Sequence, residues 1–217
     1  MITCQHLIWD WNGTLLNDSW VCVEILNTLL LQYNKKTTTH EAYLKAFGFP
    51  VAAYYEQLGF DFSVDPFGVI ADEYIDRYST RQYECALYNG TSTVLETLQQ
   101  AKIPQSILSA YHEAYLLEAV SKFQIDHFFT HIKGREDHYA TSKIDAGHDL
   151  IGKLGIPAEH TVLIGDTLHD LEVARALGSQ SILISHGHQN ADRLADADCL
   201  VVPDISCIPE HIRFPAQ

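Results

Sequence analysis

Short apolar runs alternate with amphipathic stretches over most of the chain, and the two patterns predict different elements. A first apolar run ends at Trp9, and later runs of buried-strand length cover 106–108, 128–132, 161–164 and 181–184. Apolar positions spaced by three and four residues predict helices over 94–100, 113–123, 145–154 and 170–177. A last run at 199–202 predicts a short edge strand. Strands that alternate with helices indicate an α/β fold with a doubly wound parallel sheet.

The pattern differs between residues 17 and 88. Apolar side chains recur at helical spacing from Trp20 to Tyr33 and again over 67–78, and no strand pattern interrupts them. Asp18 or Ser19 is expected to cap the first of these helices. We therefore predict an α/β core formed by 1–16 and 89–217, with a small all-helical cap of residues 17–88 inserted after the first strand and lying over the sheet.

Composition narrows the range of partners. The 217 residues carry a formal net charge of −14, which argues against nucleic acid and against an anionic membrane surface. No apolar stretch approaches the ~20 residues of a membrane span, and the first residues lack the basic start of a signal peptide. The five cysteines are scattered without a Cys-x-x-Cys pair, which indicates reduced thiols. We expect a soluble, cytoplasmic protein.

Reactive side chains follow several of the predicted strands. Asp10 ends the first apolar run, Ser109 follows the second, and Asp166 follows the run at 161–164. In an open parallel sheet, ligands bind beyond the carboxyl ends of the strands. Asp166 and Asp170 are four residues apart, a pair that suits a hard cation, although Asp170 could equally cap a helix. Taken singly, Ser109 and Lys143 carry little information.

Taken together, these residues resemble the haloacid dehalogenase superfamily. The first family motif, Asp-x-Asp-Gly-Thr, is similar to Asp10-Trp11-Asn12-Gly13-Thr14, and the fourth, Gly-Asp-x-x-x-Asp, matches Gly165 to Asp170. Ser109 and Lys143 stand in the places of the second and third motifs. Tyr88-Asn89-Gly90 and the later Ser185-His186-Gly187-His188 resemble the phosphoglycolate-phosphatase-like branch, which has a helical cap.

The resemblance implies a function and a set of roles. It implies a Mg²⁺-dependent phosphatase that acts on a small phosphorylated metabolite, with Asp10 as the nucleophile that forms an aspartyl-phosphate. Asp10, the backbone carbonyl of Asn12, Asp166 and Asp170 would hold the Mg²⁺. The resemblance also implies that Gly13 and Thr14 of the turn, Ser109 and Lys143 bind the phosphate group, and that Lys143 takes part in catalysis.

Asn12 departs from the family pattern. The family has a carboxylate there, which protonates the leaving oxygen and later activates water, whereas a carboxamide cannot exchange a proton at neutral pH. General acid–base help is worth roughly 10²–10⁴ in rate. We therefore expect a slow or selective enzyme. Aryl and acyl phosphates, whose leaving groups need little protonation, should be less affected than alkyl phosphates.

Two other classes of function stay open at this point. Dehalogenases and phosphonoacetaldehyde hydrolases of the superfamily also lack the second carboxylate. A dehalogenase would not need the acidic motif at 165–170. A phosphonoacetaldehyde hydrolase would need a lysine in the cap, for which Lys35, Lys36 and Lys45 are candidates. The third possibility is a phosphate-binding or regulatory protein without turnover.

Several histidines lie near these motifs. We expect His186 and His188 to belong to a turn after an edge strand rather than to a metal site, and His169 to be a loop side chain near the cleft.

Overall fold

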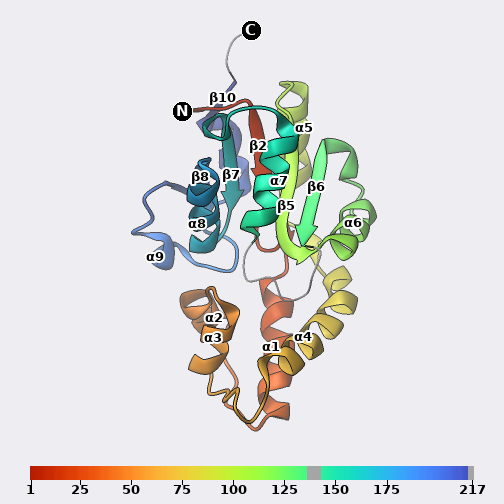
Figure 1. The fold of residues 1–217 in the computed structure, drawn as a ribbon, viewed down its shortest axis with the longest axis vertical. Coiled ribbons are helices and arrows are strands. Elements are labelled where there is room, and N and C mark those ends of the chain that lie inside the picture. Colours follow the sequence, from red (N-terminus) through yellow and green to blue (C-terminus); the bar gives the residue numbers. More distant parts are fainter. Residues whose placement is uncertain (136–142, 215–217) are drawn as a thin grey trace.

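A six-stranded parallel sheet forms the larger part of the molecule, and a group of helices lies beyond one end of it (Figure 1). The computed structural model describes residues 1–135 and 143–214. The sheet has the strand order β6-β5-β2-β7-β8-β9. Its strands are β2 (His6–Trp9), β5 (Gln105–His112), β6 (His131–Arg135), β7 (Thr161–Gly165), β8 (Gln180–Ile184) and β9 (Leu200–Val202).

The central strand β2 explains why the sheet is covered on both faces. All four of its residues are buried. Because successive side chains of a strand point to opposite faces, Leu7 and Trp9 enter one apolar cluster and Ile8 enters another. Parallel sheets need both faces covered for this reason. The helices that cover them are α5 (Thr91–Gln100), α6 (Glu113–Lys122), α7 (Ile144–Leu154) and α8 (Leu168–Leu177).

These helices divide between the two faces. Leu150 of α7 and Val173 of α8 pack with Ile8 on one face. Leu95 of α5 and Leu116 of α6 belong to the cluster on the other face. The predicted doubly wound α/β fold is therefore confirmed, and β9 is at the edge of the sheet, as expected.

The helical part lies at the carboxyl ends of the strands (Figure 1). It comprises α1 (Ser19–Gln32), α2 (His40–Ala46), α3 (Val51–Gln57) and α4 (Phe67–Arg81). Two short antiparallel strands, β3 (Leu16–Asn17) and β4 (Ala86–Leu87), stand at its entry and exit. The sequence predicted no strand between 17 and 88, and β4 corrects this, because two residues are too few for an alternating pattern.

The division into a core of 1–16 and 89–217 and a cap of 17–88 stays a prediction. One continuous hydrophobic cluster contains Trp9 and Ile164 of the sheet together with Leu26 and Ile70 of the helical part. The ends of the chain are joined by another short pairing, of β1 (Ile2–Thr3) with β10 (Ile212–Arg213). Within 1–135 and 143–214, no helix has both the length and the apolar character needed to cross a membrane.

Hydrogen bonds also join the helical part to the sheet. Gln189 is buried, donates from Nε2 to the Phe47 carbonyl at 2.8 Å and accepts at Oε1 from the Leu168 amide at 2.8 Å. Arg193 of α9 (Ala191–Leu194) donates to the Lys45 carbonyl at 3.0 Å. Gln189 thus links the end of α2 to the start of α8.

We predict that Gln189→Ala lowers the free energy of unfolding by about 1–3 kcal/mol, because two backbone groups lose their buried partner. Hydrogen exchange should become faster in α2 and α3. Gln99→Ala is the matched control: Gln99 is exposed, and its loss should cost under about 0.5 kcal/mol. Urea unfolding measures both variants, and equal effects would contradict the linking role of Gln189.

Candidate functional site

Neighbouring strands bring the predicted site residues together at the carboxyl end of the parallel sheet. Asp10 follows β2 and Asp166 follows β7, and these strands are hydrogen-bonded to each other. Their pairing continues as the Asp10 amide donates to the Ile164 carbonyl at 2.8 Å. Ser109 lies inside β5 at a register irregularity rather than at the strand end that the sequence predicted. Its Oγ accepts the Tyr111 amide at 3.1 Å.

Lys143 is a buried, positively charged residue at this carboxyl end of the sheet. It precedes α7, is 2% exposed, and its Nζ donates to Asp10 Oδ1 at 2.8 Å and to Asp170 Oδ1 at 2.6 Å. Burial works against its charge, but Asp10 and Asp170 outweigh burial and raise the pKa of Lys143 above its usual range. The ammonium group therefore stays protonated between the two carboxylates.

The two carboxylates respond differently to this cation. Burial raises the pKa of Asp10 to about 6, although Lys143 acts in the opposite direction. Burial also acts to raise the pKa of Asp170, but Lys143 and the Thr167 hydroxyl outweigh it and lower that pKa below its usual value. Asp170 Oδ2 accepts the Thr167 amide at 3.0 Å and its hydroxyl at 2.7 Å, which makes Asp170 part of a capping box at the start of α8.

Asp166 is held by groups from two other loops. Its Oδ1 accepts the Thr14 hydroxyl at 2.9 Å, and its Oδ2 accepts the His188 amide at 2.6 Å. Burial raises its pKa to about 8. Gly13 and Gly187 approach this carboxylate so closely that a methyl group on either would overlap it, and Gly13 has a φ of +73°. Gly13, in the first motif, is therefore needed because a side chain there would prevent the close approach to Asp166 of the fourth motif.

The chemistry of this cluster fits a divalent cation. Asp10, Asp166 and Asp170 are buried and offer oxygens that all lie within 4.8 Å of one another. Lys143 offsets only part of their charge, and the pKa of Asp166 near 8 means that the cluster favours a further positive charge there, either a proton or a divalent cation. Carboxylate oxygens are the ligands that Mg²⁺ prefers. Asp166 and Asp170 both accept hydrogen bonds at each oxygen, but Asp170 is in addition paired directly with Lys143, at 2.6 Å.

Asn12 is held by hydrogen bonds to the helical part. Its Nδ2 donates to Asp18 Oδ2 at 2.8 Å and to the Tyr78 hydroxyl at 2.5 Å, and Tyr78 itself donates to Asp18 Oδ2 at 2.6 Å. Asp18 occupies the N-cap position of α1, but its side chain makes no capping hydrogen bond, so the expected capping role of Asp18 is wrong. It accepts the Gly13 amide instead, at 2.8 Å. Asp18 and Tyr78 are site residues that the sequence did not reveal.

His188 is a further residue that the sequence reading assigned differently. It follows β8, which is an interior strand and not the expected edge strand. Its Nε2 lies 3.3 Å from Asp18 Oδ1, and its Nδ1 is hydrogen-bonded to the Tyr43 hydroxyl at 2.9 Å. Burial disfavours the charged ring, but Asp18 outweighs burial and raises the pKa of His188 to about 9. His188 and Asp18 therefore form a buried ion pair between the sheet and the helical part.

The other two histidines do not join this pair. His186 stacks on Tyr88 with ring centroids 3.6 Å apart, and burial lowers its pKa to about 4. His169 lies in the first turn of α8, not in a loop as expected, and stacks on Phe49 with ring centroids 4.3 Å apart. The position of His169 beside the cleft agrees with the prediction from sequence, as does the turn after a strand that contains His186 and His188.

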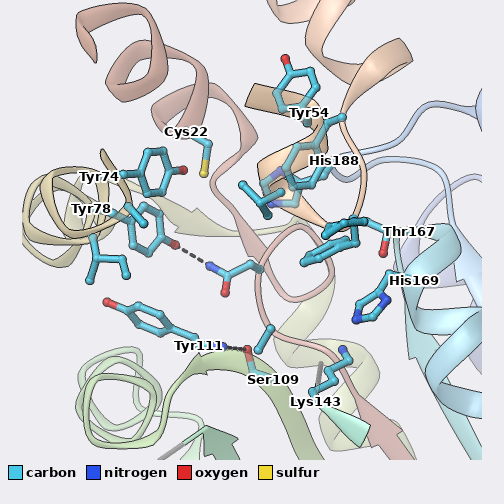
Figure 2. A pocket seen from close by; sticks show the side chains of 18 of the residues that line it. Cys22, Tyr54, Tyr74, Tyr78, Ser109, Tyr111, Lys143, Thr167, His169 and His188 are labelled. Carbon is cyan, nitrogen blue, oxygen red and sulfur yellow. Dashed lines mark hydrogen bonds between the residues drawn. The ribbon is translucent and has the colours of Figure 1, made fainter. Parts of the chain in front are cut away.

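A cavity of about 520 Å³ joins these groups. Figure 2 shows Tyr74, Tyr78 and Tyr111 on one side of it, with Lys143, Thr167 and His169 on another. The predicted site residues that line it are Asp10, Asn12, Ser109, Lys143, Asp166 and Asp170. Gly13 and Thr14 do not line it and act on Asp166 and Asp18 instead. Lys35, Lys36 and Lys45 do not line it either, so the helical part, residues 17–88, places no lysine for a Schiff base there.

Comparison with known proteins identifies the family. Residues 7–184 match the haloacid dehalogenase-like hydrolases. The chain is 21% identical over 97% of its length to a phosphoglycolate phosphatase of Pseudomonas syringae pv. tomato, of which the alignment spans 81%. It is 26% identical to the phosphoglycolate phosphatase of Aliivibrio fischeri over 54% of its length, and spans about half (52%) of that relative.

Solved structures show the same fold. A predicted phosphatase from Clostridium acetobutylicum superposes with a TM-score of 0.83 at 19% identity, covering 96% of this chain and 98% of the other. Protein tyrosine kinase A of Mycobacterium tuberculosis superposes with a TM-score of 0.80 at 22% identity, covering 96% and 97%. The motifs, the parallel sheet and the match over 7–184 agree, and this chain belongs to the haloacid dehalogenase-like hydrolase family.

Proposed function

We propose that this protein is a Mg²⁺-dependent phosphatase that hydrolyses a small phosphorylated metabolite through an aspartyl-phosphate on Asp10. The observation that carries the proposal is the Asp10 carboxylate at the cavity, with the buried Lys143 ammonium 2.8 Å from its Oδ1. An anionic nucleophile needs nearby positive charge to approach an anionic phosphoryl group. The relatives that are named phosphoglycolate phosphatases support a phosphate monoester as the substrate.

Asp10, the backbone carbonyl of Asn12 and Asp166 would hold the Mg²⁺. When bound, it would neutralise the excess negative charge of the carboxylates and of the phosphoryl group. Asp170 supports the site through Lys143 and through the start of α8. The carbonyl of residue 12 is independent of its side chain, so the asparagine is compatible with this role.

The chain's own residues perform two displacements at phosphorus. In the first, an Asp10 oxygen bonds to phosphorus as the bond to the ester oxygen breaks, while Lys143 and Ser109 bind the phosphoryl oxygens. In the second, water attacks phosphorus, phosphate leaves and the Asp10 carboxylate is restored. Asn12 supplies no proton to the ester oxygen and takes none from the water, so both steps depend on the intrinsic acidity of the groups involved.

We predict that the second displacement limits turnover of aryl phosphates. Phenolate leaves without a proton, whereas water still needs a base. Phenyl phosphate with Mg²⁺ should release a burst of phenol equal to the enzyme concentration, followed by a slow steady rate. Acid-quenched protein should carry one phosphoryl group on the peptide that contains Asp10. Asp10→Asn should abolish both signals. A burst without protein phosphorylation would contradict the aspartyl-phosphate.

We predict that Lys143→Met lowers kcat by about 10²–10³, the loss typical for one preorganised donor to a phosphoryl group or oxyanion. The variant also leaves Asp10 and Asp170 without their shared cation. Lys153→Met, at an exposed position of the same helix, is the matched control. Phosphate release is measured beside urea unfolding, so that a loss of folding is separated from a loss of chemistry. Activity of Lys143→Met within threefold of the unaltered protein would refute the assigned role.

We predict that Asn12→Asp raises turnover by at least about tenfold on alkyl phosphates and less on aryl phosphates. Asp18 Oδ2 lies 2.8 Å from Asn12 Nδ2, so the new carboxyl would face a carboxylate, which favours retention of one proton by the pair. Asn34→Asp adds the same charge at an exposed position as a control. If Asn12→Asp is no faster on any phosphate ester, position 12 does not limit the reaction.

Binding of Mg²⁺ and phosphate without turnover, in calorimetry beside the assay, would instead indicate a phosphate-binding protein.

A further inference from the structure

The cavity extends from Asp10 deep into the helical part. Its walls there come from all four helices and their connections, with Leu26 of α1, Tyr43 of α2, Tyr54 of α3 and Tyr74 of α4 among them. A volume of about 520 Å³ exceeds what a phosphoryl group and a two-carbon acid would fill and lies in the range of pockets for drug-sized ligands. The organic part of the substrate is therefore large.

The walls of this inner part are aromatic. Tyr43 stacks on Phe47 with ring centroids 4.8 Å apart, and Tyr54 meets Phe47 edge-on at 5.6 Å. On the opposite wall, Tyr78 meets Tyr111 edge-on at 5.5 Å (Figure 2). Aromatic walls favour a flat aromatic guest, because ring pairs gain energy beyond the area that they bury.

Several tyrosine hydroxyls of these walls are already engaged, although the buried Tyr54 hydroxyl has no hydrogen-bond partner among the described residues. Tyr43 is hydrogen-bonded to His188, Tyr78 donates to Asp18, and Tyr74 interacts with Cys22. The Tyr54 hydroxyl can bind one polar atom of a guest, but a guest with many hydroxyl groups, such as a sugar, would leave most of its hydroxyls without partners there. Burying an unpaired hydroxyl is costly.

Charge excludes an anionic guest from the same space. Among the described residues of α1–α4 and their flanks that line the cavity, Asp18 is the charged one, and His188 pairs with it. The lysine and the arginine in the described lining, Lys143 and Arg135, both come from the sheet part. Among the described residues, a carboxylate or a second phosphate deep in the cavity would meet His188 alone as a cation, and that cation is already paired with Asp18. An unpaired buried charge is strongly unfavourable.

Asn12 points to the same class of substrate independently of the walls. A phenol has a pKa of about 10, so its anion leaves far more readily than that of an alkyl alcohol, which is nearly as basic as hydroxide. An enzyme without an acid at residue 12 works best on an ester of such a group.

We propose that the substrate is an aryl phosphate, a phosphate monoester of a bulky, uncharged phenol whose rings fill the aromatic part of the cavity. This inference rests on the proposed phosphatase function. Atoms balance as in that reaction: the bond from phosphorus to the phenolic oxygen breaks, the phenolate takes a proton from solvent, and water supplies the fourth oxygen of phosphate.

Matched esters test the proposal. The values of kcat/KM with Mg²⁺ are compared for phenyl, 2-naphthyl and 4-ethylphenyl phosphate, for phosphotyrosine and for phosphoglycolate. Naphthyl should exceed phenyl by about tenfold through added apolar contact. The ethylphenyl ester should exceed phosphotyrosine, which has a similar phenol but two charged groups, by at least about tenfold. Equal or reversed order in these pairs, or a preference for phosphoglycolate, would overturn the proposal.

A variant assigns the preference to the cavity. Ala71→Phe on α4 narrows the lining and should remove the advantage of naphthyl over phenyl, with urea unfolding as the check that the variant is folded. Val69→Phe is the matched control, because Val69 lies on the same helix, is 51% exposed and does not line the cavity. An unchanged naphthyl preference in folded Ala71→Phe would show that these walls do not select the substrate.

Calorimetry with the non-hydrolysable 2-naphthylmethyl phosphonate separates the two proposals. Binding about tenfold tighter than methyl phosphonate, together with no hydrolysis of any ester, would refute the phosphatase function and retain the aromatic site. Hydrolysis of esters with no preference of the protein for the naphthyl phosphonate would retain the phosphatase and refute the aromatic site.

Discussion

The ion pairs of Lys143 hold the candidate site together. Asp10, Asp166 and Asp170 are buried at one edge of the sheet, where the low effective dielectric strengthens their mutual repulsion. The Lys143 ammonium group bonds two of them, at 2.8 and 2.6 Å. It thereby orients Asp10 and, through Asp170, couples the site to the first turn of α8. The remaining negative charge is what makes the site suited to a divalent cation.

A second group of buried charges connects the sheet to the helical part. Asp18 accepts hydrogen bonds from the Gly13 amide, the Asn12 carboxamide and Tyr78, and it pairs with His188. An amide at position 12 donates to Asp18 at every pH, whereas a carboxylate there would repel it. Asn12 is thus matched to the carboxylate at position 18. Compared with a carboxylate, Asn12 cannot transfer a proton, but its hydrogen bonds to Asp18 at the start of α1 and to Tyr78 of α4 do not depend on pH.

The aromatic residues of α2, α3 and α4 have two roles. Tyr55 of α3 and Tyr78 of α4 are buried in the hydrophobic cluster that stabilises the helical part, and both also contribute to the cavity wall. The same packing that fixes the helices over the sheet therefore shapes the space beside Asp10. Stability and selectivity depend on one set of side chains, and a change to a wall residue is expected to affect both.

Much of the fold followed from local patterns. Apolar runs and helical spacing identified the six sheet strands and the helices between them, because each pattern depends only on neighbouring residues. Element limits differed where local signals were weak: β5 continues through Ser109 to His112, and β4 is only two residues long. The positions of Asp10 and Asp166 at the carboxyl ends of their strands also followed, whereas the pairing of β2 with β7 came from the structure.

The sequence by itself determined the sheet, the helices and the carboxylates at the strand ends. Only the tertiary structure decided what surrounds them: that Asp18 turns from its helix to Asn12, that His188 pairs with Asp18, and that Asp170 both caps α8 and binds Lys143. The contacts of His188 with Asp18 and of Asp170 with Lys143 join residues far apart in the chain, and the local contact of Asp18 with Asn12 also involves Tyr78 of α4. The spacing of apolar residues along the chain does not predict them, because they depend on how the helical part packs against the sheet.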